Sequence, residues 1–207
     1  MGKYTLNDVC FFDCETTGVP AKGAKWDTDY MEFPHIVQLA WSIGEKECNY
    51  IIKPDGWVIP AEVVEIHGIT TERAIAEGVP LQDVIGDFLA DANTAPLVYA
   101  HNIYFDSSII KAEVLRIFGR EYYDINVENA LHKEKRIDTM MKTIRFVGAT
   151  YSNGRPGKFP RLEELYAKLF NGESFPEHDA LEDIRALKSC LVELVKLGII
   201  ELVKKEY

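Results

Sequence analysis

The chain has 207 residues, of which 47% are hydrophobic and 27% are charged, and its formal net charge is −10 at pH 7. This composition is ordinary for a globular protein, so we expect one domain over residues 1–207 and a cytoplasmic location. The acidic balance argues against a broad basic face that wraps duplex nucleic acid, but it allows a local grip on a strand end. No apolar run approaches the roughly 18 residues of a membrane span and the start lacks a signal-peptide core, so we expect no membrane partner.

Strand and helix patterns alternate along the sequence. Strands are predicted over residues 9–13, 36–43, 49–53 and 96–100, with the end of a fifth strand at 136–139. Helices are predicted from Ala61 to a stop at Gly68, over residues 81–89, from Asn102 to Phe118, and from near Asp179 to Gly198. This order predicts an α/β fold, and the close second and third strands predict a hairpin within a mixed sheet.

The segment VCFFDCETTG places Asp13 and Glu15 two positions apart at the end of the first strand. Side chains two apart on a strand share a face, so these carboxylates converge and repel each other. A divalent metal ion between them is the economical remedy, and Mg²⁺ typically takes one or two protein carboxylates. Cys14 points to the opposite face and is expected to be passive. The four cysteines lack the density of a disulfide framework, so we expect all of them to be reduced.

Two later segments add residues that can carry chemistry. AHNIYFD places Asp106 one helical turn beyond Asn102, just after a strand expected beside the first one. HDALEDIRAL places Asp183 in the first turn of the last helix and His178 just before its cap at Asp179. His178 and Asp183 can meet at one site only if His178 lies outside the helix, as the capping pattern predicts.

The motifs D-x-E-T-T-G, A-H-N-x-x-F-D and H-x-A-x-x-D, in this order, resemble those of the DEDDh exonucleases of the DnaQ-like family, within the ribonuclease H-like fold. IHGIT (residues 66–70) and RIDT (residues 136–139) are also similar to segments of the proofreading exonucleases related to the DNA polymerase III epsilon subunit. The resemblance runs from about Val9 to Leu194. It implies a five-stranded sheet whose second strand is antiparallel.

Matched position by position, the resemblance implies that Asp13, Glu15, Asp106 and Asp183 bind the metal and that His178 is the general base. Two divalent metal ions, Mg²⁺ with Mn²⁺ expected to substitute, can hold the attacking and leaving oxygens of an in-line displacement when they lie about 3.5–4 Å apart. An imidazole, with an ordinary pKa of about 6.5, can accept a proton from water near neutral pH. The implied products are nucleoside 5′-monophosphates released from a 3′ end.

Further residues are candidates for contact with the substrate. The candidates are Thr16, Thr17 and Gly18 in the turn after the acids, His67, Asn102, and Arg155 and Lys158 in the basic loop 148–161. Each has a structural alternative: turn geometry, a helix-end histidine, a helix cap and a solvated loop, respectively. For His101, Phe105 and Asp138 the structural role is favoured.

The leading hypothesis is a metal-dependent 3′–5′ exonuclease on single-stranded ends, with DNA preferred to RNA because IHGIT favours the proofreading branch. The alternative enzyme is an RNA 3′-end trimming exoribonuclease of the RNase T or oligoribonuclease type, since the sequence does not show which groups approach a 2′-OH. Nucleic acid 3′ ends are the expected partner, together with a polymerase or another replication or repair protein. A polymerase-docking module and a small-molecule phosphoesterase remain as alternatives of other classes.

Overall fold

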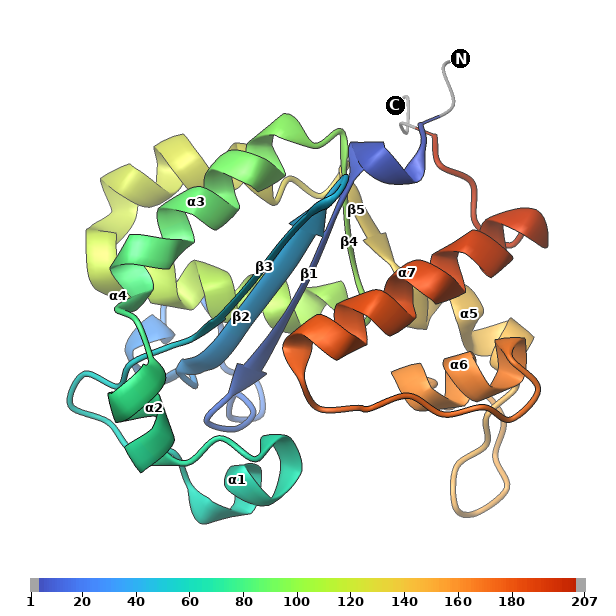
Figure 1. Cartoon of the computed structure of the whole chain (residues 1–207), viewed down its shortest axis with the longest axis horizontal. Coiled ribbons are helices and arrows are strands. Elements are labelled where there is room, and N and C mark those ends of the chain that lie inside the picture. The colour runs from blue at the N-terminus through green and yellow to red at the C-terminus, as the bar shows by residue number, and fades with distance from the viewer. Residues whose placement is uncertain (1–3, 204–207) are drawn as a thin grey trace.

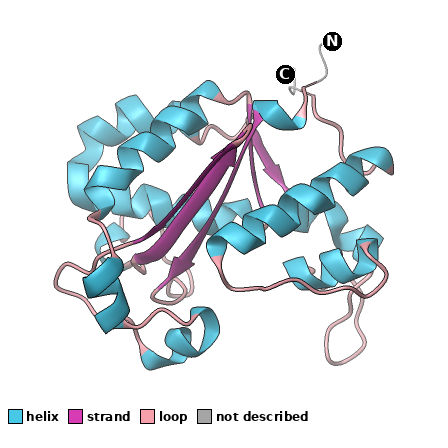
Figure 2. Ribbon diagram, in the orientation of Figure 1, coloured by secondary structure: helices cyan, strands magenta, loops and turns pink. Residues whose placement is uncertain are grey.

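The computed structural model describes residues 4–203, so part of the chain start considered above, Met1 to Lys3, lies outside the described residues. Its middle layer is a twisted five-stranded sheet with helices on both faces (Figures 1 and 2). The strands are β1 (Val9–Thr16), β2 (Ile36–Ile43), β3 (Lys46–Ile51), β4 (Leu97–Ala100) and β5 (Arg136–Asp138), in the order β3-β2-β1-β4-β5. β2 is antiparallel to β1 and β3, whereas β1, β4 and β5 are parallel. The predicted α/β fold with one antiparallel strand is confirmed.

Seven α-helices surround the sheet within the described residues. They are α1 (Ala61–His67), α2 (Thr71–Glu77), α3 (Leu81–Thr94), α4 (Ile103–Ala130), α5 (Thr139–Val147), α6 (Leu162–Leu169) and α7 (Ala180–Lys196). Short 3-10 helices lie at Leu6–Asp8 and Tyr30–Glu32. Helices α3 and α4 cover one face, α5 to α7 lie on the other, and α1 and α2 lie at the end toward which β1 points (Figure 1). No helix in the described part of the chain is long and apolar enough to cross a membrane.

The alternation of β1 divides the core into two layers. Cys10, Phe12 and Cys14 pack in the cluster formed with α3 and α4. Val9 and Phe11 pack on the other face, in the cluster that holds the buried stripe of α7. Because side chains alternate along a strand, the residues that follow Phe11 at odd positions continue the α7 face. This alternation places Asp13 and Glu15 on the same side of the sheet.

Three short helices were not predicted: α2, α5 and α6. Each has seven to nine residues, too few turns for a clear helical period. The sequence does contain an N-cap residue for two of these helices: the side chain of Thr70 caps α2, and that of Asp138 caps α5. Helix α4 also continues past the predicted stripe, through a break in helical geometry at Gly119 (φ 77°).

The prediction for the third strand was displaced. β3 begins at Lys46 rather than Asn49, because a tight turn at Gly44 and Glu45 pairs Ile43 directly with Lys46. The first residues of this edge strand, Lys46 and Glu47, are polar, so they do not extend the apolar pattern from which the strand was predicted. The pairing of β1 with β2 extends β1 beyond its predicted end at Asp13, since Thr16 still pairs with Ile36.

Candidate active site

Asp13 and Glu15 lie near the end of β1 on the face covered by α7. They continue the row of side chains begun by Val9 and Phe11, which are buried against α7. Asp183 lies in the first turn of α7 and faces them. One carboxylate oxygen from each of Asp13, Glu15 and Asp183 lies within 4.8 Å of the others. The predicted convergence of these three acids is therefore present in the structure.

Asp106, the fourth predicted acid, comes from the first turn of α4 and is only 3% exposed. Its Oδ1 accepts hydrogen bonds from the backbone N–H of Cys14 (3.3 Å) and from the Cys14 thiol (3.2 Å). Asp106 therefore reaches the site from the opposite layer, through the strand position between Asp13 and Glu15. The prediction that Cys14 points to the opposite face is confirmed, but the expectation that it is passive is wrong. The thiol donates to one of the four acids.

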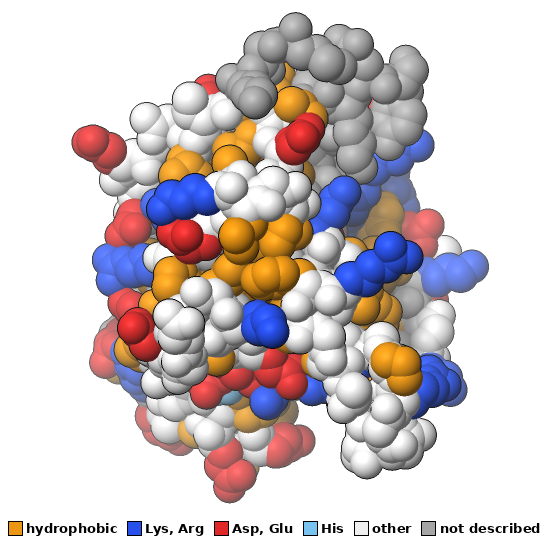
Figure 3. Space-filling model, turned by 90° about the vertical axis from the view of Figure 1, so that its right-hand side faces the viewer, with side chains coloured by type: hydrophobic (Ala, Val, Ile, Leu, Met, Phe, Trp, Pro, Cys, Tyr) orange, Lys and Arg blue, Asp and Glu red, His pale blue; other side chains and the backbone are white. Residues whose placement is uncertain are grey.

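The crowding of these acids shifts their protonation. Burial is the largest cause that raises the pKa of Asp13 well above its ordinary value, and the charge of Asp106 is the next. Burial raises the pKa of Asp106 to about 7. It raises the pKa of Asp183 to about 8, with repulsion from Glu15 adding to the effect. Figure 3 shows the molecule from the right-hand side of Figure 1. Acidic side chains gather in the lower part of that view, whereas Lys and Arg side chains are scattered over it.

Carboxylate oxygens packed in this way suit a hard divalent cation. Mg²⁺ and Mn²⁺ prefer such oxygen ligands, and a cation among them would offset the repulsion that adds to the effect of burial on the pKa values. The carboxylate oxygens of Asp13, Glu15 and Asp183 are close enough together to bind one ion, and Asp106 lies next to Asp13. The donor set therefore fits the predicted metal ions.

His178 lies just outside α7, as predicted, because the side chain of Asp179 caps that helix by accepting from the N–H groups of Leu181 and Glu182. Its backbone has a left-handed conformation (φ 68°), and its N–H donates to Oδ2 of Asp183 at 3.2 Å. The His178 side chain is 49% exposed. When protonated, it opposes the burial effect that raises the pKa of Glu15. The ring thus lies beside the acids and remains open to solvent.

Gln38 is a site residue that the sequence analysis missed. It lies opposite Glu15 in the β1–β2 register and is 3% exposed. Its amide nitrogen donates to Oδ2 of Asp179 at 3.0 Å, and its amide oxygen accepts from the N–H of Ala180 at 3.2 Å. Gln38 therefore fixes the start of α7, and with it Asp183, against the sheet. The available signal was a glutamine within the otherwise apolar run IVQLAWSI.

The predicted substrate contacts near β1 do lie together. The Thr16 hydroxyl donates to the carbonyl of Gly18 at 2.6 Å, and the N–H of Thr17 donates to the carbonyl of His35 at 2.9 Å. His67 lies near Thr16 and His178: burial lowers its pKa, the Thr16 backbone opposes this, and a protonated His178 adds to it. His67 Nδ1 also accepts from the N–H of Ile69, so the ring is fixed at the end of α1.

The other predicted contacts are engaged with protein groups. Lys158 pairs with Glu164 at 2.7 Å, and the guanidinium of Arg155 lies over the ring of Tyr151 at 4.9 Å. Neither contacts one of the four acids in the described part of the chain. The prediction that Lys158 clamps phosphate is thereby weakened, because its charge already has a partner.

Asn102 occupies the position before α4 but does not cap it with its side chain, so the predicted cap is wrong. Instead its left-handed backbone (φ 69°) directs its N–H to Oδ1 of Asp138 at 3.2 Å. Asp138 accepts from Met141 as well, which confirms its predicted structural role. His101 bonds to the Pro160 carbonyl at 2.9 Å, and Phe105 packs against the core, both as expected.

The metal-free protein is expected to lose stability as pH rises. Asp106 and Asp183 have pKa values of about 7 and about 8 in the folded protein, against an ordinary value of 3.8. Between about pH 4 and 8 the folded state therefore binds more protons than the unfolded state, and the free energy of unfolding falls with increasing pH. We expect the Tm in EDTA to be several degrees lower at pH 8 than at pH 5.5.

Mg²⁺ or Mn²⁺ should raise the Tm more at pH 8 than at pH 5.5, because cations bind the ionised carboxylates. Scanning calorimetry in EDTA and in metal, at matched ionic strength, measures both effects. A Tm in EDTA that rises steadily over this range would contradict the prediction.

Comparisons with known proteins agree with this geometry. The family model RNase_T, described as Exonuclease, matches residues 10–191. Exonuclease I from Methylocaldum szegediense has a TM-score of 0.65 and 21% identity, covering 91% of this chain and 40% of that one. E. coli exonuclease I in complex with a dT13 oligonucleotide has a TM-score of 0.65 and 24% identity, covering 91% and 40%. An ExoI/SSB-Ct complex has a TM-score of 0.65 and 20% identity, covering 91% and 41%.

A search of curated proteins found no match. The chain spans about two fifths of the exonuclease I chains that it matches, and at these identities the likeness shows the shared fold. The family model, by contrast, spans most of the chain and includes all four acids and His178. The chain therefore belongs to the RNase_T exonuclease family, the DEDDh, DnaQ-like exonucleases, and shares the RNase H-like fold.

Proposed function

We propose that the chain hydrolyses single-stranded DNA from the 3′ end in a metal-dependent reaction and releases nucleoside 5′-monophosphates. The observation that carries the proposal is the convergence of carboxylate oxygens from Asp13, Glu15 and Asp183 within 4.8 Å. Asp106 lies close enough to raise the pKa of Asp13 further. Partly buried acids that repel each other destabilise a fold unless a cation binds them, so their position supports a metal-dependent reaction.

Two divalent cations, Mg²⁺ or Mn²⁺, would be held by the four acids. Asp13, Glu15 and Asp183 would hold the cation beside the attacking water, and Asp106 would help to hold the other. When bound, such a pair stabilises the attacking and leaving oxygens of an in-line displacement at phosphorus. The contribution of the chain is to hold the carboxylates in place from three separate elements, β1, α4 and α7.

We assign the general base to His178. Its ring is about half exposed, and its backbone N–H is bonded to Asp183, so the imidazole is held at the edge of the acid cluster. A ring nitrogen accepts a proton from the water as the oxygen of that water bonds to phosphorus. The bond from phosphorus to the 3′ oxygen of the preceding nucleotide breaks, and that oxygen leaves with a proton taken from solvent.

The terminal nucleotide is assigned to the turn formed by Thr16, Thr17 and Gly18, together with His67. This turn directly follows the acids, and His67 lies near both Thr16 and His178. A local grip of this kind agrees with the net charge of −10 and the scattered cations of Figure 3. The dT13 complex of E. coli exonuclease I supports DNA as the strand.

A replication or repair protein is the partner that we propose. The ExoI/SSB-Ct complex is a precedent in a protein of the same fold. A polymerase partner and a role in proofreading remain predictions of the IHGIT segment. Co-purification with a polymerase tests the docking role separately from catalysis.

The proposal is tested with 5′-labelled single-stranded DNA, single-stranded RNA and a mismatched duplex, each incubated with Mg²⁺, Mn²⁺ or EDTA. We expect stepwise shortening of the DNA strand and release of mononucleotides with either metal and none in EDTA. Faster shortening of RNA would favour the RNA-trimming alternative. The proposal fails if metal gives no shortening of any strand, or if the Asp13→Ala protein is equally active.

A further inference from the structure

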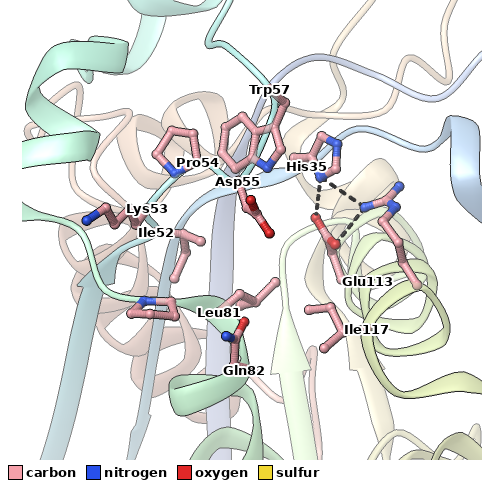
Figure 4. Close-up of a pocket in the computed structure, with 12 residues that line it drawn as sticks. His35, Ile52, Lys53, Pro54, Asp55, Trp57, Leu81, Gln82, Glu113 and Ile117 are labelled. Carbon is pink, nitrogen blue, oxygen red and sulfur yellow. Dashed lines mark hydrogen bonds and ion pairs between the residues drawn. The ribbon is translucent and has the colours of Figure 1, made fainter.

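A pocket of about 470 Å³ lies on the side of the sheet opposite the α7 face, against α3 and α4 (Figure 4). It is bounded by the segment after β3, the first turn of α3 and the middle of α4. Its polar and aromatic lining comprises His35, Lys53, Asp55, Trp57, Gln82, Glu113 and Arg116. None of these residues takes part in the reaction proposed above. The volume is in the range of small-molecule sites, which run from about 300 to 1,000 Å³.

One wall of the pocket is aromatic and rigid. The rings of His35 and Trp57 stack with centroids 4.7 Å apart and planes 3° apart. Glu113, which is 3% exposed, lies 3.1 Å from His35 Nδ1 and pairs with the Arg116 guanidinium at 2.6 Å, and Arg116 Nη1 also lies 3.0 Å from His35 Nδ1. Arg116 in turn donates to two carbonyl groups of the loop before β2. This network holds the stacked wall in place, so the pocket is formed in advance.

The remaining polar groups of the pocket are free to meet a ligand. The side chains of Lys53, Asp55 and Gln82 form no hydrogen bond with another residue in the described part of the chain. In Figure 4, Asp55 and Gln82 project toward the space between the aromatic wall and the apolar side chains of Leu81 and Ile117. A carboxylate and an amide are groups that hydrogen-bond base edges, and flat apolar walls suit the faces of a base.

The charge of the pocket favours a neutral ring over a phosphate. Glu113 already neutralises Arg116, and the charge of Asp55 offsets that of Lys53. A phosphate group would meet one unpaired cation and one unpaired anion, which gives no net attraction. A nucleobase is planar and uncharged, and it presents donors and acceptors at its edge.

The pocket is joined to the turn beside the acids. The N–H of His35 donates to the Thr17 hydroxyl at 2.9 Å, and the N–H of Thr17 donates to the His35 carbonyl at 2.9 Å. Thr17 lies two residues beyond Glu15, a span of about 7 Å along extended chain. A strand whose 3′ end lies at the acids can therefore place a nearby base at this wall.

We propose that this pocket binds a single unstacked nucleobase. Where the base belongs to the substrate strand, one to three nucleotides from its 3′ end, the inference rests on the proposed function. The same chemistry would also accept the base of a free mononucleotide. A base of the substrate strand would change the kinetics of strand shortening, whereas the base of a free mononucleotide would change only the binding of that nucleotide.

The first arm is kinetic and uses the wild-type chain on single-stranded DNA with one abasic residue at the second, third or fourth position from the 3′ end. An abasic residue at the pocket position should raise KM about fivefold or more and change kcat little, because stacking on an aromatic wall stabilises a bound base. Gln82→Ala and Trp57→Ala should reduce that penalty to less than twofold. Asp83→Asn, at the exposed neighbouring position, is the matched control and should preserve it.

The second arm measures binding of dAMP by calorimetry to the Asp13→Ala protein in EDTA, where the metal-dependent site contributes least. If the affinity for dAMP falls about tenfold when Gln82→Ala is combined with Asp13→Ala, the result supports binding of the base in the pocket. Such binding without an abasic effect assigns the pocket to a free nucleotide. No abasic effect and no Gln82-dependent binding overturn the inference, while strand shortening by the wild-type protein still upholds the proposed function. If the wild-type protein shortens no strand, the proposed function fails and the dAMP arm alone decides the pocket.

Discussion

An Asp13→Asn variant is expected to lose about a thousandfold in kcat and, in the absence of metal, to become more stable than the wild-type chain. Asp13 lies between Glu15, Asp183 and Asp106, and its pKa is raised by burial and by the charges of all three. Losing one ligand from a two-cation site removes several kcal/mol of transition-state stabilisation, which corresponds to about 10³ in rate. The amide of Asn removes a partly buried charge that repels its neighbours.

The stability gain should depend on pH. At about pH 5.5 much of the cluster is protonated and the two proteins should have similar Tm values in EDTA. At pH 8 the Tm of Asp13→Asn should exceed that of the wild type by about 4 °C, given that about 1 kcal/mol shifts the Tm of a chain this long by roughly 2–4 °C. The fall of Tm with increasing pH should also be shallower in the variant, since one acid no longer titrates.

Asp124→Asn provides the matched control, because Asp124 is exposed on α4. It should leave kcat unchanged and alter the Tm by less than about 1 °C, as surface substitutions usually do. Calorimetry in EDTA and the strand-shortening assay in Mg²⁺ measure the two effects. An Asp13→Asn protein that is less stable than wild type at pH 8 in EDTA would contradict the proposed repulsion. One that shortens DNA at the wild-type rate would contradict its catalytic role.

What could be predicted from the sequence was local. The two-residue period of β1 places Asp13 and Glu15 on one face, and the structure confirms this. The capping residue Asp179 places His178 outside α7, where it can turn back toward Asp183. In both cases the spacing of residues within one element decides where a side chain points.

What could not be predicted depends on contacts between distant elements. The bond from Cys14 to Asp106 joins residues 92 positions apart, and the bond from Gln38 to Asp179 joins residues 141 apart. Strand parity gives the face on which Cys14 lies, but it does not say which helix terminus packs there. The pairing of Lys158 with Glu164 is a shorter-range example. The basic composition of loop 148–161 was visible, whereas the acid from α6 that meets it was not.

The stacked wall of the further pocket belongs to the same class. His35 and Trp57 come from two separate loops, and the buried Glu113 that fixes His35 lies 78 positions away from it. Nothing in the sequence near any of the three indicates the others. Long-range side-chain contacts therefore decide the features of this chain that go beyond its family motifs.

A His178→Asn variant is expected to lower kcat by about 10²- to 10⁴-fold while retaining the metal-dependent rise in Tm. General bases typically contribute a factor of this size. The hydrogen bond to Asp183 comes from the backbone N–H of residue 178, so replacing the ring leaves that bond in place. Asn is the better replacement here because position 178 has φ 68°, a left-handed conformation that Asn tolerates better than Ala does.

The two readouts separate a proton acceptor from a structural support. If His178 accepts the proton, the His178→Asn and His178→Ala variants should lose kcat alike, with KM and the Mg²⁺-dependent Tm shift close to wild type. If the ring instead supports the acids, the Tm shift should fall together with kcat, because Glu15 and Asp183 would no longer hold the cation. Single-turnover shortening of 5′-labelled DNA gives the first quantity and calorimetry with and without Mg²⁺ gives the second. A His178→Asn protein within threefold of wild-type turnover would remove His178 from the chemistry, because an Asn side chain cannot accept a proton from water as an imidazole does.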